Sequence, residues 1–153
     1  QNIEEKYTVN ESIHLQIQFE IVEQSKAMNV RFFLTTPNGV LLFSSIDNLV
    51  TEKTSAQRKI GLYTETVTIP KELLDEGTYL ISVELCNAAD VTQSVIAKDC
   101  LVMKIIDDRL PFGVRGNWPN RWPAGLMRPK LEWHIQQTEV PRATIAVASE
   151  SLS

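Results

Sequence analysis

Cysteine and histidine are scarce in this sequence of 153 residues, which contains only two of each. The two cysteines, Cys86 and Cys100, are too few for a disulfide framework. They are also too few for a four-ligand zinc site unless the distant His14 and His134 take part. Both cysteines lie in runs of β-strand character, where a free cysteine behaves as a small hydrophobic residue. We therefore expect two reduced, structural thiols and no metal site.

Long hydrophobic runs and the motifs of common enzyme classes are also missing. No run approaches the roughly 18 apolar residues of a transmembrane helix, and no secretory signal pattern occurs. The phosphate-binding patterns GxxxxGK[ST] and GxGxxG are absent, as are the hydrolase patterns HExxH and GxSxG. Adjacent acids such as Asp75-Glu76 and Asp107-Asp108 are typical of solvated turns and strand ends. The sequence therefore predicts a domain with no catalytic residues.

Positive charge is in short supply overall but concentrated in one segment. The net charge of −4 argues against general nucleic-acid binding. Five basic residues and no acid lie between Arg109 and Leu131, which leaves −9 for the rest of the chain. This asymmetry predicts either a site for an anionic ligand or internal pairing with the acidic remainder.

Alternation of apolar and polar residues is the strongest pattern present. Residues 13–21 alternate over nine positions, which is the period of a half-buried strand. Residues 29–35 and 40–44 flank Pro37-Asn38-Gly39, a turn sequence, and predict a β-hairpin. Further strands are expected at 61–69, 78–86, 99–106 and 130–136. Residues 70–77 fit one helical turn that ends at Gly77, and residues 46–59 fit an exposed polar loop.

About seven short strands, with no helical period, predict an all-β fold: an antiparallel immunoglobulin-like or jelly-roll β-sandwich. In immunoglobulin-like order, 13–21 and 61–69 share one sheet, and 29–36, 40–44, 78–86 and 99–106 share the other. Tyr79, which follows Gly77, is typical of a tyrosine corner. The sandwich domain is expected to span 1–137, followed by a mobile tail at 138–153 with room for a short strand at 144–147.

Candidate ligand-binding residues lie on the outward positions of these strands. Arg31, Phe33 and Glu84 are expected on the outer face of the larger sheet, where an aromatic ring and an arginine can hold a sugar. Gln16 and Gln18 form a polar strip on the other sheet that can hydrogen-bond sugar hydroxyls. The alternatives are that Phe33 packs under a loop or partner, and that the glutamines belong to an ordinary wet sheet face.

The segment 115–123 mixes arginines with tryptophans and prolines. Taken alone, such a segment can bind an anionic glycan, single-stranded nucleic acid or a peptide. The alternative is a long connection that packs its tryptophans over the sandwich edge and pairs its arginines with acids.

Two groups of motifs resemble a known family. They are Ile69-Pro70…Leu73-Leu74…Gly77…Tyr79, and Arg115-Gly116-Asn117-Trp118 followed by Met127-Arg128-Pro129-Lys130-Leu131-Glu132-Trp133. They resemble the C-terminal carbohydrate-binding domain of the ATP-binding subunit of O-antigen/polysaccharide ABC transporters (Wzt-like), over nearly all of residues 5–137. The resemblance implies a non-catalytic domain that follows an ATPase domain, and the start at Gln1 agrees with an excised module.

The resemblance also implies a function and partners. The implied role is to recognise the capped non-reducing end of a bacterial glycan chain before its export. ATP and Mg²⁺ are then expected only in the ATPase domain, and no cofactor in this fragment. Implied partners are a second copy, through an exchanged strand at 130–136, and a transmembrane permease subunit.

The implied location is cytoplasmic, peripheral to the inner membrane, with no nucleic acid bound and no direct membrane insertion. Structural or dimer-interface roles are implied for Trp118, Arg128, Leu131 and Trp133. Two other readings stay open: a dimerisation domain without ligand, and an extracellular adhesive sandwich with a Cys86–Cys100 bridge.

Overall fold

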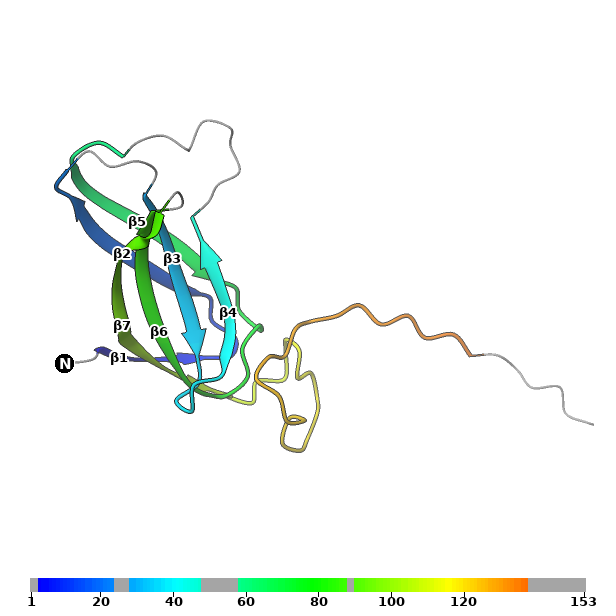
Figure 1. The fold of residues 1–153 in the computed structure, drawn as a ribbon. Coiled ribbons are helices and arrows are strands. Elements are labelled where there is room, and N and C mark those ends of the chain that lie inside the picture. The colour runs from blue at the N-terminus through cyan, green and yellow to red at the C-terminus, as the bar shows by residue number, and fades with distance from the viewer. Residues whose placement is uncertain (1–2, 24–27, 48–57, 88–89, 138–153) are drawn as a thin grey trace, which may run out of the picture.

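The computed structural model describes residues 3–23, 28–47, 58–87 and 90–137, and in these ranges it contains seven strands and no helix. Figure 1 shows their arrangement. The strands are β1 (Ile3–Thr8), β2 (Ile13–Ile21), β3 (Met28–Thr35), β4 (Leu41–Ile46), β5 (Gly61–Ile69), β6 (Gly77–Asn87) and β7 (Asp90–Ile106).

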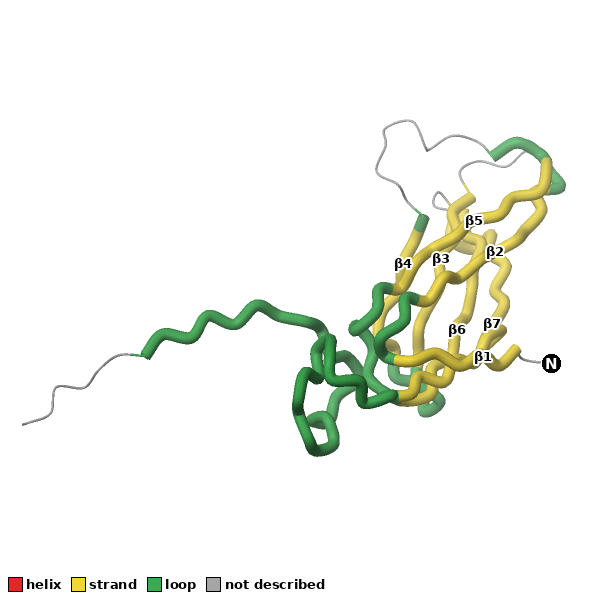
Figure 2. The backbone as a smooth tube through the Cα atoms, turned by 180° about the vertical axis from the view of Figure 1, so that it is seen from behind, coloured by secondary structure: helices red, strands yellow, loops and turns green. Residues whose placement is uncertain are grey.

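The strands form two sheets, as the alternation predicts. One sheet has five strands in the order β1-β7-β6-β3-β4, and the other pairs β2 with β5. In Figure 2 the β2–β5 pair lies across one face of the five-stranded sheet. The all-β class and the division of the predicted strands between two sheets are therefore confirmed.

The expectation of a purely antiparallel sandwich is wrong in one respect. The predicted strands omit β1, which pairs parallel to β7, so the five-stranded sheet is mixed. Ile3 and the charged side chains of β1 are exposed, and only its last two residues are half-buried. Only Tyr7 of β1 packs against the core, and one inward apolar residue is too few to give a period-2 pattern in the sequence.

The expected strand at 130–136 is also absent from the structure. The described part of the chain offers residues 130–137 no pairing partner, and they extend away from the sandwich (orange in Figure 1). Leu131, Trp133 and Ile135 are 64%, 83% and 92% exposed. Alternation creates an apolar face, but a strand also needs a neighbour to accept its backbone hydrogen bonds. The expected tail at 138–153, including 144–147, lies outside the described residues.

The hairpin turn and the tyrosine corner agree with the sequence. Gly39 adopts φ 84° between β3 and β4, and its backbone N–H donates to the Thr36 carbonyl over 2.9 Å. The Tyr79 hydroxyl donates to the Asp75 carbonyl over 2.9 Å and lies 3.1 Å from the Leu126 carbonyl oxygen. Burial raises the pKa of Tyr79 to about 12, so this hydroxyl stays a donor at neutral pH.

The hydrophobic core occupies one end of the space between the sheets. Its buried members come from all the strands except β1 and β4, together with Val9 and Leu74. They are Val9, Ile13, Leu15, Phe32, Leu34, Ile69, Leu74, Tyr79, Ile81, Met103 and Ile105. Leu34 and Met103 are fully buried. The residues from β2 and β5 are Ile13, Leu15 and Ile69, at one end of that pair, so the opposite end is left without a comparable core.

Candidate functional site

The structure brings three of the predicted ligand-binding residues together on the outer face of the five-stranded sheet. Arg31 lies opposite Glu84 in the β3–β6 ladder, and its Nε donates a hydrogen bond to the Glu84 carboxylate. The Arg31 guanidinium also lies over the Phe33 ring, 4.9 Å from the ring centroid. Residues two apart on one strand share a face, so this contact follows from the alternation of β3. The three side chains form what we call the Arg31 cluster.

Within the Arg31 cluster, the three groups differ in accessibility. The Arg31 side chain is 41% exposed, whereas that of Glu84 is only 10% exposed. The hydrogen bond from Arg31 is the main reason why the pKa of Glu84 lies below its usual value. Glu84 was expected to face a ligand, but its position instead makes it the residue that orients Arg31. In the described part of the chain, the terminal nitrogens of Arg31 have no partner, so they can accept a ligand.

The structure places Gln16 and Gln18 on the other side of the molecule. Both are exposed on the outer face of β2, in the two-stranded sheet. Their cross-strand neighbours are Thr66 and Thr64 of β5. They therefore do not share a site with the Arg31 cluster, and the two sets of predicted residues are competing sites.

The basic segment, residues 109–131, is held to the sandwich by ion pairs. Arg128 is only 3% exposed and lies between Asp75 and Asp107, with Nε 2.9 Å from Asp75 Oδ1 and Nη1 3.0 Å from Asp107 Oδ2. Arg115 pairs with the same Asp107 carboxylate and donates to the Asn120 carbonyl over 2.8 Å. These contacts agree with the alternative in which arginines of this segment pair with acids in the rest of the chain.

The other residues of the basic segment are more accessible. Trp118 is 49% exposed and donates through Nε1 to the Arg121 carbonyl, 3.1 Å away. Arg121 has an 87% exposed side chain, 3.9 Å from Glu76. Leu131 and Trp133, in the stretch that extends away from the sandwich, are also exposed.

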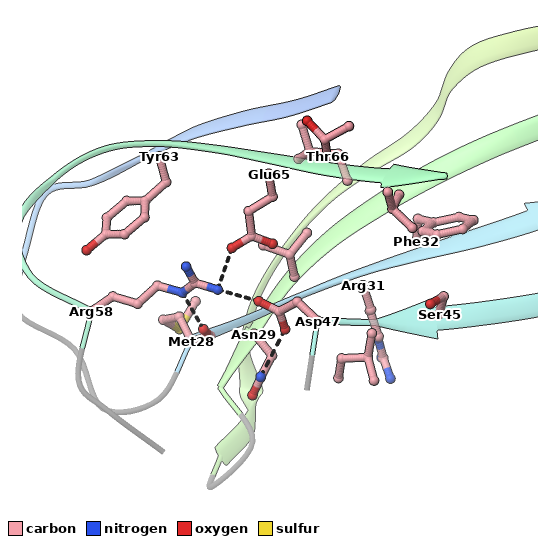
Figure 3. Close-up of a pocket in the computed structure, with 14 residues that line it drawn as sticks. Met28, Asn29, Arg31, Phe32, Ser45, Asp47, Arg58, Tyr63, Glu65 and Thr66 are labelled. Atoms are coloured by element: carbon pink, nitrogen blue, oxygen red, sulfur yellow. Dashed lines mark hydrogen bonds and ion pairs between the residues drawn. The ribbon is translucent and has the colours of Figure 1, made fainter. Parts of the chain in front are cut away.

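The sequence interpretation missed a pocket between the two sheets. A cavity of about 710 Å³ lies between β5 on one side and β3 and β4 on the other. Its polar lining residues include Asn29, Asp47, Arg58 and Glu65, shown in Figure 3. Asp47 and Arg58 had been assigned to an exposed loop, but their side chains are only 17% and 18% exposed. The ion pair between Asp47 and Arg58 explains why both charged side chains can be largely buried.

One sequence signal could have revealed this pocket. In Tyr63-Thr64-Glu65-Thr66-Val67, the alternation that points Tyr63 and Val67 inward also points Glu65 inward. An acid at an inward position needs a partner, and the partner, Arg58, lies seven residues earlier. The burial of Glu65 outweighs the attraction of Arg58 and raises its pKa above the usual value.

Neither the two cysteines nor the possible metal ligands form a reactive site among the described residues. Cys86 is buried and Cys100 half-buried, and both are free thiols, as expected. In the part of the chain that the structure describes, no group of three or more His, Cys, Asp or Glu side chains could hold a metal ion. The same residues include no helix that is long and apolar enough to span a membrane.

Comparison with known proteins finds nine chains of solved structures that are similar to this chain. No family model and no curated protein matches the sequence. Among solved structures, the chain is similar to one titled "Crystal structure of the C-terminal domain of wzt", with a TM-score of 0.49 and 15% sequence identity. The alignment covers 69% of this chain and 71% of that chain.

Proposed function

We propose that this chain is a non-catalytic carbohydrate-binding domain that recognises the capped non-reducing end of a bacterial surface polysaccharide. In this proposal it couples the glycan to export by an ABC transporter, at the cytoplasmic face of the inner membrane. ATP, Mg²⁺ and the permease subunit are then contacted by a separate ATPase domain. Support comes from the sequence motifs described above and, above all, from the Arg31 cluster.

The Arg31 cluster has the chemistry that sugar recognition needs. The half-buried Phe33 ring supports the Arg31 guanidinium that lies over it, and the Arg31 terminal nitrogens can donate to hydroxyl or carboxylate oxygens. Glu84 holds Arg31 in place through Nε, so the donors are oriented before the ligand arrives. The cluster lies on paired strands rather than on a loop, which keeps its geometry rigid.

A binding titration tests this proposal and separates the two faces. Glycan from the protein's own source is titrated with and without its natural chain end. We expect binding only with the end, and a loss of affinity of about tenfold or more in Phe33→Ala, since tenfold corresponds to ~1.4 kcal/mol. Gln18→Ala, on the opposite face, is the matched control and should bind as the unaltered domain does.

The outcomes discriminate between the candidate faces. A loss of glycan affinity in Gln18→Ala but not in Phe33→Ala would place the binding site on the β2–β5 face. Equal binding of both glycan forms would remove the role of the chain end. Absence of binding from a well-folded domain would support a dimerisation domain without ligand.

We also propose that two copies of the chain pair through residues 130–136. This segment carries Leu131, Trp133 and Ile135 on alternate positions, all strongly exposed. Among the residues that the structure describes, the five-stranded sheet has open edges at β1 and β4, and both strands of the β2–β5 pair have an unpaired side. A strand from a second copy could occupy one of these edges and cover the apolar side chains.

Sedimentation measurements on the full chain test the pairing. We expect a dimer for the unaltered chain and a monomer for Trp133→Glu, because a charge at that position cannot be buried in an interface without a partner. Glu132→Gln changes a neighbouring residue that alternates to the opposite side, and it should leave the dimer intact. A monomeric unaltered chain at the highest soluble concentration would contradict this proposal.

A further inference from the structure

The cavity between the sheets has the size of a small-molecule site. Its volume of about 710 Å³ lies within the usual range of ligand pockets, roughly 300–1,000 Å³. Arg31 borders this cavity, but Phe32 and Arg31 leave β3 in opposite directions (Figure 3). The Phe32 side chain lines the pocket, while the Arg31 side chain pairs with Glu84 on the outer face.

One cation in this pocket serves two acids. Arg58 Nη2 pairs with Asp47 and also lies 2.6 Å from Glu65 Oε1. Arg58 Nε donates to the Met28 carbonyl over 2.8 Å, and Asn29 Nδ2 donates to Asp47 Oδ1 over 3.0 Å. Figure 3 shows these groups converging at one end of the pocket. The other cation among the described lining residues, Arg31, pairs with Glu84. That leaves Arg58 as one cation beside two acids, so this group lacks one positive charge.

Aromatic rings hold the shared guanidinium in a defined position. The Arg58 guanidinium carbon lies 5.2 Å from the ring centroids of both Phe19 and Tyr63. These two rings stack on each other with centroids 5.4 Å apart and an interplanar angle of 8°. Arg58 is therefore held by contacts on several sides while it contacts both acids.

Keeping two partly buried acids beside one cation costs free energy, and the stability of the fold gives no reason for the second acid. Glu65 is 25% exposed and Asp47 17% exposed, and burial together with the nearby Asp47 raises the pKa of Glu65. A single acid would have satisfied Arg58 as an ion pair. A second, partly buried carboxylate beside it is favourable when a further cation enters the pocket.

Most of the remaining lining of the pocket is apolar, although Ser45 and Thr66 also belong to it. Its walls include Ile17, Val30, Phe32, Ile46 and Val67, which come from both sheets. Such walls fit the non-polar face of a compact ring, while the polar end fixes its orientation.

We propose that the pocket between the sheets binds a compact organic cation of about the size of one sugar ring, with its ammonium group beside Glu65 and Asp47. The ammonium group adds the missing positive charge and donates hydrogen bonds to the two carboxylates. The ring covers the apolar wall formed by Ile17, Val30 and Phe32. The proposal does not depend on glycan recognition by the Arg31 cluster.

Binding of small probes to the full chain, followed by amide NMR shifts at neutral pH, tests this site. Glucosamine and cyclohexylamine carry an ammonium group on a compact ring, while glucose and N-acetylglucosamine lack the charge. We expect saturable shifts at Asn29, Asp47 and Glu65 with an amine and none with the neutral sugars at equal concentration. Binding of glucosamine alone would identify an amino sugar, and binding of both amines would identify the ammonium group as sufficient.

Two matched variants complete the test. Glu65→Gln keeps the shape and removes one charge, and we expect amine affinity to fall by about tenfold or more. Glu20→Gln makes the same change on the outward face of the β2–β5 sheet and should leave affinity unchanged. Equal binding of glucose and glucosamine, unchanged affinity in Glu65→Gln, or no saturable binding of either amine would overturn the proposal. Glycan-end binding lost with Phe33→Ala is measured separately, so the two proposals fail independently.

Discussion

Replacing Arg128 by alanine is expected to lower the free energy of unfolding by about 3–5 kcal/mol, the usual cost of removing one partner of a buried ion pair. Arg128 is almost fully buried and contacts two acids, Asp75 and Asp107, whose side chains are only 8% and 3% exposed. Its removal leaves Asp75 buried with no cation and removes a stacking contact with Trp122, 5.1 Å away. Urea unfolding of the variant and the unaltered chain measures the difference.

Arg121→Ala provides the control for this experiment. Arg121 belongs to the same segment, but its side chain is 87% exposed and lies 3.9 Å from Glu76. An exposed pair of this kind contributes at most about 1 kcal/mol. Similar losses in Arg121→Ala and Arg128→Ala would mean that the segment contributes through general charge rather than through the buried network.

The pH dependence of stability gives a second readout of the same network. Burial alone would raise the pKa of Asp107, but hydrogen bonds from Arg115, the Arg109 backbone and Arg128 outweigh it and lower the pKa to about 2. Because the folded pKa lies below the unfolded value of about 3.9, the stabilisation is complete above that value. It is lost as the pH falls towards 2. The difference in stability between the unaltered chain and Arg128→Ala should therefore shrink over this range.

Leu34→Ala is expected to cost about 2–5 kcal/mol, the range for a leucine removed from a well-packed core. Leu34 is fully buried within the core at one end of the sandwich. Ile17→Ala should cost no more than about 1.5 kcal/mol, because Ile17 is half-buried and already borders the pocket. Thermal or urea unfolding of both variants makes the comparison.

This contrast tests whether packing is uneven along the sandwich. Equal losses would show that the space between the sheets is filled as well at the pocket end as at the core end. That result would also weaken the proposed amine site, which needs the pocket to be open in the free protein. A difference of at least about 1 kcal/mol supports a pocket that is formed before ligand binding.

The strand pattern was predictable because burial imposes a local period. Residues 13–21 and 61–69 alternate in sequence, and the structure pairs them along their whole length. The same logic placed Arg31 and Phe33 on one face of β3. It failed for β1, where only Tyr7 packs against the core. At 130–136 the alternation exists but no partner strand lies beside it in the described part of a single copy, so the exchanged strand stays a prediction.

The sequence predicted the candidate sites only in part. Alternation put Arg31, Phe33 and Glu84 on one outer face, but it could not show that Glu84 is covered and serves to orient Arg31. It placed Gln16 and Gln18 on the other sheet, as the structure does, but it could not decide which of the two faces binds a ligand. Which strands become neighbours depends on pairing between distant segments, and no local pattern encodes that.

The sequence by itself determined the all-β class, the face on which most strand residues lie and the turns that join them, since these follow from local periodicity and turn chemistry. Only the tertiary structure decided that Arg58 reaches both Asp47 and Glu65, and that Arg128 is buried between Asp75 and Asp107. Both arrangements join residues from separate elements, and charges become partly buried only where such elements meet. The physical reason is that an ion pair depends on distance in space, whereas the sequence records only distance along the chain.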